Sequence, residues 1–273
     1  AQSKAELVEM LSQARLQSHA VEIAEKATAA ILLEPTKAAV SSRIGGDPDL
    51  PAKAEWPTLR ATKKALCERY TASSVNGILD DAKSVDMPFA FMAQIDLEEV
   101  GDHDAANLLP DDGLLSFFFR PDLMFEEKVG NSKSDWRYSL PCAVLYSPKG
   151  TKRTLTKSPE AVVDWRTEPV NVAFDHAWLV PEIGRLPNDL GRASVAYIEW
   201  RQAELELPQD QMVCFPTGTH DGDVPPKGGR VLLSTRLRDP MYDGSFSWAY
   251  FCIDDASLAA HDFSKAFVRI STE

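Results

Sequence analysis

Short apolar runs separated by proline, glycine and aspartate recur along the chain. The two clearest are Phe89–Leu97 and Leu114–Phe119, with the turn Leu109–Gly113 between them. Runs of this length with this punctuation are typical of antiparallel strands, so we predict a mainly β (α+β) fold. The other predicted strands are Ile31–Leu33, Ala143–Tyr146, Val170–Phe174, Val195–Trp200, Met212–Phe215, Val231–Leu237, Phe246–Ile253 and Ala266–Ile270.

The first thirty residues have helical spacing instead. Ser3 and Glu6 fit a capping box, and apolar residues follow at intervals of three and four. A second helical stretch runs from His19 to Ala29, and we expect the two helices to cover a sheet. The chain is therefore predicted to contain an N-terminal helical segment, residues 1–30, and one domain, residues 31–273.

Two segments break the strand pattern. Residues 42–57 contain Gly45-Gly46, several prolines and two aspartates, which exclude regular structure, yet Ile44, Leu50 and Trp56 are apolar enough to anchor an ordered loop. The polar stretch Thr58 to Met87 predicts a surface excursion with helical composition from Ala61 to Tyr70.

The pattern of residues 89–123, strand, turn, aromatic strand and acidic turn, returns near the C-terminus. Two related halves, residues 31–150 and 151–273, would each contribute a hairpin to a shared core. Chance similarity of two short aromatic strands is the alternative.

The chain is acidic. It carries 41 acidic and 29 basic residues, a net charge of -12, with a pI of about 4.9. Such a surface repels phosphate backbones and attracts basic partners, although it can also serve solubility alone. No apolar run approaches the length that spans a bilayer. The four cysteines are far apart, which predicts reduced thiols in a cytoplasmic protein.

Catalytic signatures are missing from the sequence. No nucleotide-binding, metalloprotease or serine-hydrolase motif occurs, so we predict no catalytic residues and no cofactor. We interpret His176 as a structural histidine. The best metal candidate is Thr219–Asp223, but this segment lacks the register of a calcium loop and is expected to be solvated, so no metal site is predicted.

Several blocks resemble the YwqG-like family, a bacterial domain of unknown function. Ser42-Arg43-Ile44-Gly45-Gly46 with Leu50-Pro51 and Trp56-Pro57 resembles its opening block, and Phe91–Leu97 with Gly113–Phe118 its next block. Asp254–Leu258 with Phe263 resembles its closing block. The family's histidine before the Met212 strand is Asp210 here, and Thr58–Met87 resembles an insertion. The resemblance implies a β roll with two related halves and no established activity.

We therefore expect a non-enzymatic protein-binding module, an immunity protein that neutralises a basic toxin being the leading example. It would be a cytoplasmic monomer or weak dimer that binds neither nucleic acid nor membranes, with Thr58–Met87 as its specificity surface. The alternative is a small-ligand-binding protein or an enzyme with a pocket near residues 45–56. Its candidate binding residues are Arg43, Gly45, Gly46, Trp56, Gln94 and Asp96. A purely structural interpretation is that Arg43 and Asp96 hold this loop to the sheet.

Overall fold

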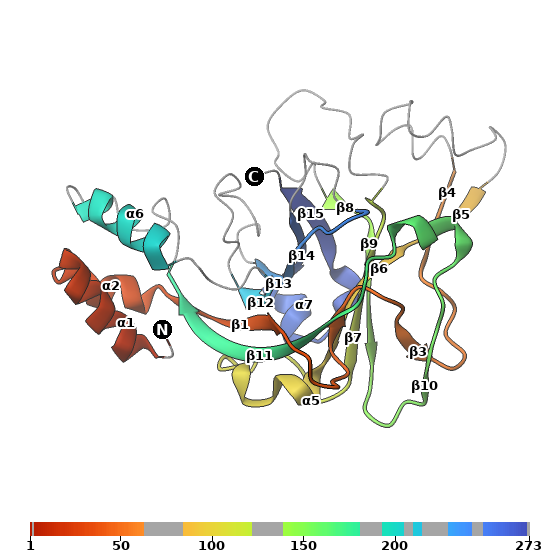
Figure 1. Ribbon diagram of the computed structural model, residues 1–273, viewed down its shortest axis with the longest axis horizontal. Coiled ribbons are helices and arrows are strands. Elements are labelled where there is room, and N and C mark those ends of the chain that lie inside the picture. The colour runs from red at the N-terminus through yellow and green to blue at the C-terminus, as the bar shows by residue number, and fades with distance from the viewer. Residues whose placement is uncertain are drawn as a thin grey trace.

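The computed structural model shows one large antiparallel sheet with short helices beside it (Figure 1). The predicted mainly β, α+β fold is confirmed. The structure describes residues 1, 3–62, 84–121, 139–180, 193–204, 210–214, 229–241 and 248–271. The segment Thr219–Asp223 and the middle of the predicted 58–87 excursion lie outside the described residues.

The chain begins with two helices joined by a π-helical turn. They are α1 (Lys4–Leu11), the turn η1 (Ser12–Leu16) and α2 (Ala20–Glu25). The Ser3 hydroxyl accepts a hydrogen bond from the Glu6 N–H at 3.1 Å, which confirms Ser3 as the N-cap. The second helix is shorter than predicted, because Thr28 and Ala29 already belong to β1 (Thr28–Pro35).

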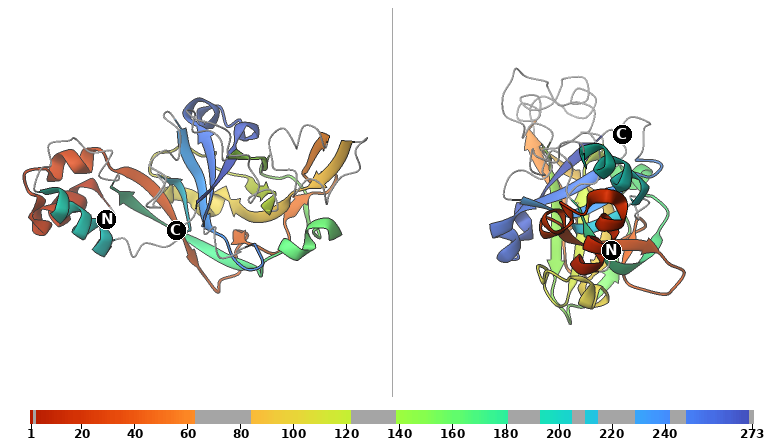
Figure 2. Two further views of the ribbon diagram at one scale, coloured as in Figure 1. Left: turned by 90° about the horizontal axis from the view of Figure 1, so that it is seen from above. Right: turned by 90° about the vertical axis from the view of Figure 1, so that its left-hand side faces the viewer.

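These helices do not cover the sheet, so that prediction is wrong. They lie at one end of the molecule, beyond the ends of β1 and β11 (Val170–Leu179), and pack on α6 (Ala193–Glu204) (Figures 1 and 2). Their apolar faces form a cluster of their own with Tyr197. The N-terminal helical segment therefore has a small core separate from that of the sheet.

The predicted strand Val195–Trp200 is also wrong, because these residues form α6. Its β-branched and aromatic residues have strand propensity, but only one face is covered. Tyr197 is 0% exposed against the N-terminal helices, whereas Val195 is 60% and Ile198 40% exposed. Tertiary packing of one helical face has overridden local propensity here.

The main sheet has 11 strands with β1 at its centre and five strands on each side. Every strand pair in it is antiparallel. The first arm, outward from β1, is β11, β2 (Arg43–Ile44), β6 (Ala90–Asp96), β7 (Leu114–Phe119) and β9 (Cys142–Ser147). The second arm is β12 (Asp210–Cys214), β13 (Gly229–Arg236), β14 (Trp248–Asp254), β15 (Phe267–Ser271) and β8 (Ser139–Leu140).

Smaller elements lie beside the main sheet. They are the pairs β3 (Asp49–Pro51) with β10 (Arg153–Leu155) and β4 (Thr58–Thr62) with β5 (Ser84–Pro88), and the 3-10 helix η4 (Glu160–Trp165). The β4–β5 pair corrects the predicted helical start at Ala61, because Ala61 is paired with Val85 as a strand residue.

The two arms curl toward each other and enclose the main core. The ring of Phe251 in β14 lies 5.2 Å from that of Phe117 and 6.2 Å from that of Phe119, both in β7. At the outer strands, the Cys142 thiol donates to the Ala266 carbonyl at 3.3 Å. The sheet is therefore a roll, held shut by apolar contacts between its arms.

Both arms contain the same arrangement of strand, aspartate and short helix. Asp96 ends β6 and caps α5 (Leu97–Val100), and its carboxylate accepts from the Glu98 N–H at 3.1 Å. Asp254 ends β14 and caps α7 (Asp255–Ala259), accepting from the Ser257 N–H at 2.8 Å. This match is consistent with two related halves, whose common origin stays a prediction.

The two proposed halves interlock. Strand β8, from the first half of the sequence, lies beside β15 in the second arm, and β11, from the second half, lies between β1 and β2 in the first arm. The boundary at residue 150 therefore divides the sequence but not the sheet.

Candidate functional site

Residues 42–57, hereafter the Gly45 loop, lie against strand β6. The loop begins in the two-residue strand β2, where Arg43 is in register with Gln94 and Ile44 with Ala93. Sheet pairing thus joins two predicted binding residues that are 51 positions apart in sequence. The loop is ordered and packed as predicted, although β2 and β3 give it more regular structure than its glycines and prolines suggested.

Gln94 is the centre of this contact and is 0% exposed. Its Nε2 donates to the Ser41 carbonyl at 2.7 Å and to Asp49 Oδ2 at 2.9 Å, while its Oε1 accepts from the Asp49 N–H at 2.9 Å. Both ends of the amide are therefore used inside the protein, and the side chain fixes the start and the middle of the loop to the sheet.

Arg43 is directed into the loop as well. Its Nη2 donates to the Asp47 carbonyl and to Asp49 Oδ2, the latter at 3.0 Å, and its side chain is only 14% exposed. The Asp47 carboxylate in turn accepts from Ser158 and pairs with Arg166 at 3.3 Å. These contacts support the interpretation that Arg43 holds the loop to the sheet.

The backbone amides of the two glycines and the indole of Trp56 also make hydrogen bonds within the protein. The Gly45 N–H donates to the Met92 carbonyl at 2.7 Å and the Gly46 N–H to the Thr167 carbonyl at 2.9 Å, so neither amide is directed at an anion. The Trp56 indole donates to the Phe89 carbonyl at 2.8 Å. The predicted binding residues in this loop thus form a structural network, and their role toward a ligand stays a prediction.

Sequence reasoning missed Glu99 in this network. Its two carboxylate oxygens accept from the Ser41 N–H at 2.6 Å and the Ser42 N–H at 2.9 Å. Nothing in the sequence singles out Glu99, because the sequence does not show that α5 lies beside the start of the loop.

Asp96 completes the contact between the loop and β6. Its N–H donates to the Ser42 hydroxyl at 2.9 Å while its carboxylate caps α5. Burial raises the pKa of Asp96, against the opposing effect of the Glu98 N–H. In the matching position of the second arm, hydrogen bonds from the Ser257 hydroxyl and N–H lower the pKa of Asp254.

These opposite shifts predict opposite responses to amidation. Asn is as good an N-cap as Asp, so Asp96→Asn and Asp254→Asn both keep their caps. At pH 7 we expect D254N to lower the urea midpoint, because a depressed folded pKa gives stability above the unfolded pKa. We expect D96N to leave the midpoint unchanged or raise it, since a raised folded pKa gives stability that is lost as pH rises.

The comparison is repeated by urea unfolding at pH 3, below the ordinary pKa of both groups. There the deficit of D254N should shrink, because its stabilising charge is lost as pH falls through the folded pKa. Equal midpoints of D96N and D254N at pH 7 would contradict the assignment.

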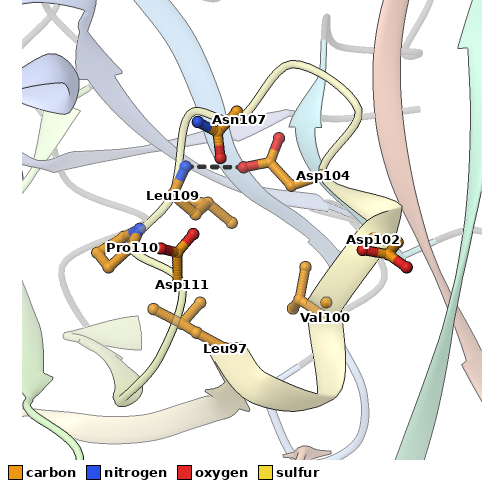
Figure 3. A pocket seen from close by; sticks show the side chains of 9 residues that line it. Leu97, Val100, Asp102, Asp104, Asn107, Leu109, Pro110 and Asp111 are labelled. Atoms are coloured by element: carbon orange, nitrogen blue, oxygen red, sulfur yellow. Dashed lines mark hydrogen bonds between the residues drawn. The ribbon is translucent and has the colours of Figure 1, made fainter.

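An acidic pocket of about 370 Å³ lies next to this network, along α5 and the chain that follows it. Its wall combines apolar side chains with three aspartates (Figure 3). The lining residues are Leu97, Val100, Gly101, Asp102, Asp104, Asn107, Leu109, Pro110 and Asp111. We call this site the acidic pocket.

Asp104 shapes the acidic pocket. Its Oδ2 accepts from the N–H groups of Leu108 and Leu109, both at 2.7 Å, and this holds the chain in a tight loop (Figure 3). Asp102 and Asp111 are exposed and have no ion-pair partner among the residues that the structure describes. The pocket therefore presents uncompensated negative charge over an apolar floor.

The surrounding sequence strengthens this charge. Seven acidic residues and no lysine or arginine stand between positions 96 and 112. Among the described residues, Lys149 pairs with Glu98, which raises the pKa of Lys149, and Arg153 opposes the raised pKa of Asp96. Such a site favours a cationic group over an anionic one.

Two other side chains bear on chemistry. Burial raises the pKa of the Cys142 thiol to about 12, so it is protonated at neutral pH and is not a nucleophile. Asp210, where the resembling family has histidine, is buried and accepts from Thr235, the Arg236 N–H and Arg238 at 2.7–2.9 Å. Its contacts are those of a structural carboxylate.

In the part of the chain that the structure describes, no helix has the length and apolar character needed to cross a membrane.

Comparison with known proteins gives one family match. The model of the family described as Domain of unknown function (DUF1963) matches residues 42–271, which include the Gly45 loop and the acidic pocket. No curated protein matches the chain.

Proposed function

Since the chain belongs to the DUF1963 family, a domain of unknown function, we propose a function from its own surface: a non-enzymatic protein-binding module whose acidic pocket receives a basic side chain of a partner protein. We further propose that it is YwqG-like and acts as an immunity protein against a basic toxin. The observation that carries the proposal is the negative charge of Asp102 and Asp111 over an apolar floor, with no ion-pair partner for either among the described residues.

The shape and chemistry of the pocket suit lysine or arginine. The apolar stem of either side chain would pack on Leu97 and Leu109, and its charged end would meet Asp111 and Asp104. The net charge of -12 would steer a basic partner toward this face over longer distances.

The competing hypothesis, a ligand pocket at the Gly45 loop, has less support. Both polar atoms of the Gln94 amide and the Nη2 of Arg43 are hydrogen-bonded to Asp47, Asp49 and Ser41, so they are not available to a ligand. A small cationic ligand in the acidic pocket is the form of that hypothesis which the charges favour.

The test is capture of a partner followed by charge reversal. The tagged chain is incubated with lysate of its native cells, and separately co-expressed with the product of the neighbouring gene, and bound proteins are identified by mass spectrometry. We expect one stoichiometric basic partner. The double variant D102K/D111K should slow association with it about tenfold or more at low salt.

The matched control is E160K/D164K, which makes the same charge change at two exposed acids of η4. This control should retain the partner and its association rate apart from the change in net charge. Equal effects of the two variants would contradict a role for the acidic pocket. A co-purifying small molecule with no protein partner would favour the ligand-binding alternative.

A further inference from the structure

Three ligand-type side chains from distant parts of the sequence meet at one edge of strand β11. They are His103 from η2 (Gly101–His103) and the adjacent Asp175 and His176 from β11. One potential ligand atom of each lies within 4.8 Å of those of the other two, and all three residues are half-buried. We call this group the histidine cluster.

The sheet explains why these residues converge. β2 pairs with β11 only at Val170 and Asn171, so the rest of this edge has no strand beside it among the described residues. The helical turn η2 contacts the open part of the edge. The ring of His103 then lies 6.1 Å from that of His176, centroid to centroid.

Asp175 belongs to the cluster because its carboxylate is turned toward the adjacent His176. Consecutive strand residues point to opposite faces. Here, however, Asp175 Oδ1 accepts from the His176 N–H at 2.7 Å and lies 3.8 Å from His176 Nδ1. The backbone N–H thus orients the carboxylate toward the histidine. Groups that do not bind a metal themselves commonly orient its ligands through hydrogen bonds of this kind.

From this geometry we propose that His103, Asp175 and His176 bind a divalent transition-metal ion, with zinc as the expected occupant. Imidazole and carboxylate are ligands that zinc prefers, at about 2.0–2.2 Å from the metal. Tetrahedral coordination places ligand atoms about 3.3 Å apart, so side-chain rotations that move the ligand atoms by roughly 1 Å would bring the cluster to that geometry.

The surroundings favour a cation. Asp102 and Asp104 flank His103 in sequence, and the uncompensated charge of the acidic pocket adds to theirs. Three protein ligands at a half-exposed edge leave a coordination position for water or an exogenous group. The bound ion would also join η2 to β11, two elements of the first arm that are separated by about seventy residues of chain.

The experiment is equilibrium dialysis of the full chain against zinc chloride, with bound metal measured by mass spectrometry. We expect one zinc ion per chain, and a fall in the association constant of about a hundredfold in His103→Ala and His176→Ala. Asp175→Asn keeps an acceptor for the His176 N–H but loses the charge, and should weaken binding in the same direction. Circular dichroism checks that each variant is folded.

The controls change histidines outside the cluster. His19→Ala lies at the start of α2, and His220→Ala lies in the acidic segment 219–223. Both should bind zinc as the parent chain does. Cobalt substitution adds a spectroscopic test, in which the d–d bands of a nitrogen–oxygen site should be present and the thiolate charge-transfer band absent.

Zinc should also raise the melting temperature by about 5 °C or more at a hundredfold excess over the dissociation constant, and not in H103A or H176A. No zinc uptake, unchanged uptake in H103A, H176A and D175N, or loss of uptake in H220A would each overturn the proposal. If an alanine variant does not fold, His103→Asn and D175N decide the outcome.

Discussion

Replacing Gln94 by leucine should lower the free energy of unfolding by about 2–4 kcal/mol, because it removes the hydrogen bonds of a fully buried amide and leaves part-buried groups of the loop without partners. Leucine fills much of the same volume but can neither donate to the Ser41 carbonyl nor accept from the Asp49 N–H. The loss is measured by urea denaturation, and hydrogen exchange at the Asp49 amide gives a local readout. That amide should exchange faster in Q94L.

The matched control is Met92→Leu, a volume-conserving change at a 2% exposed position of the same strand. It should cost less than about 1.5 kcal/mol and leave exchange at Asp49 unchanged. If Q94L costs no more than M92L, the amide does not hold the Gly45 loop, and its burial requires another explanation.

Replacing Gly45 by alanine is the second large effect. Gly45 has φ +77°, and an added Cβ would lie 2.2 Å from Thr167 Oγ1 and 2.8 Å from the Glu168 carbonyl oxygen. The hydroxyl can rotate away but the backbone carbonyl cannot move without shifting the chain. We expect G45A to lower the free energy of unfolding by about 3 kcal/mol or more, measured by urea denaturation.

Gly150→Ala separates the two causes of this cost. Gly150 has nearly the same backbone angle, φ +79°, but an added Cβ there meets nothing within 4 Å. G150A should therefore show only the conformational cost, about 1–2 kcal/mol. Equal losses in G45A and G150A would mean that close packing of the loop against Thr167–Pro169 contributes nothing.

The sequence predicted the strands well where burial is on both faces. Phe89–Leu97 and Leu114–Phe119 are continuous apolar runs, and β6 and β7 are buried along almost their whole length. It failed at Val195–Trp200, whose residues have strand propensity but pack as a helix against a partner that only the tertiary structure supplies. Strand propensity does not show which face of a segment will be buried against another element.

The candidate sites show the same division. Arg43, Gln94 and Asp96 were found because they stand within recognisable blocks, and strand register brings Arg43 and Gln94 together. The sequence does not show that these residues are hydrogen-bonded within the protein, because partners such as Asp49 and Ser42 depend on the path of the loop. The sequence predicts a structural role for His176, and nothing in it indicates that the edge of β11 faces His103 in η2.

During synthesis, strand β1 is made long before either of the two strands that pair with it. Its C-terminal residue is Pro35, but its neighbours begin only at Val170 in β11 and Asp210 in β12, at least 170 − 35 = 135 residues later. At about 5–20 residues per second, the ribosome needs roughly 7–27 s to make the first of them. Throughout that time the apolar run Ala29–Leu33 has no sheet partner, so the strand at the centre of the finished sheet is a segment for a chaperone to bind on the nascent chain.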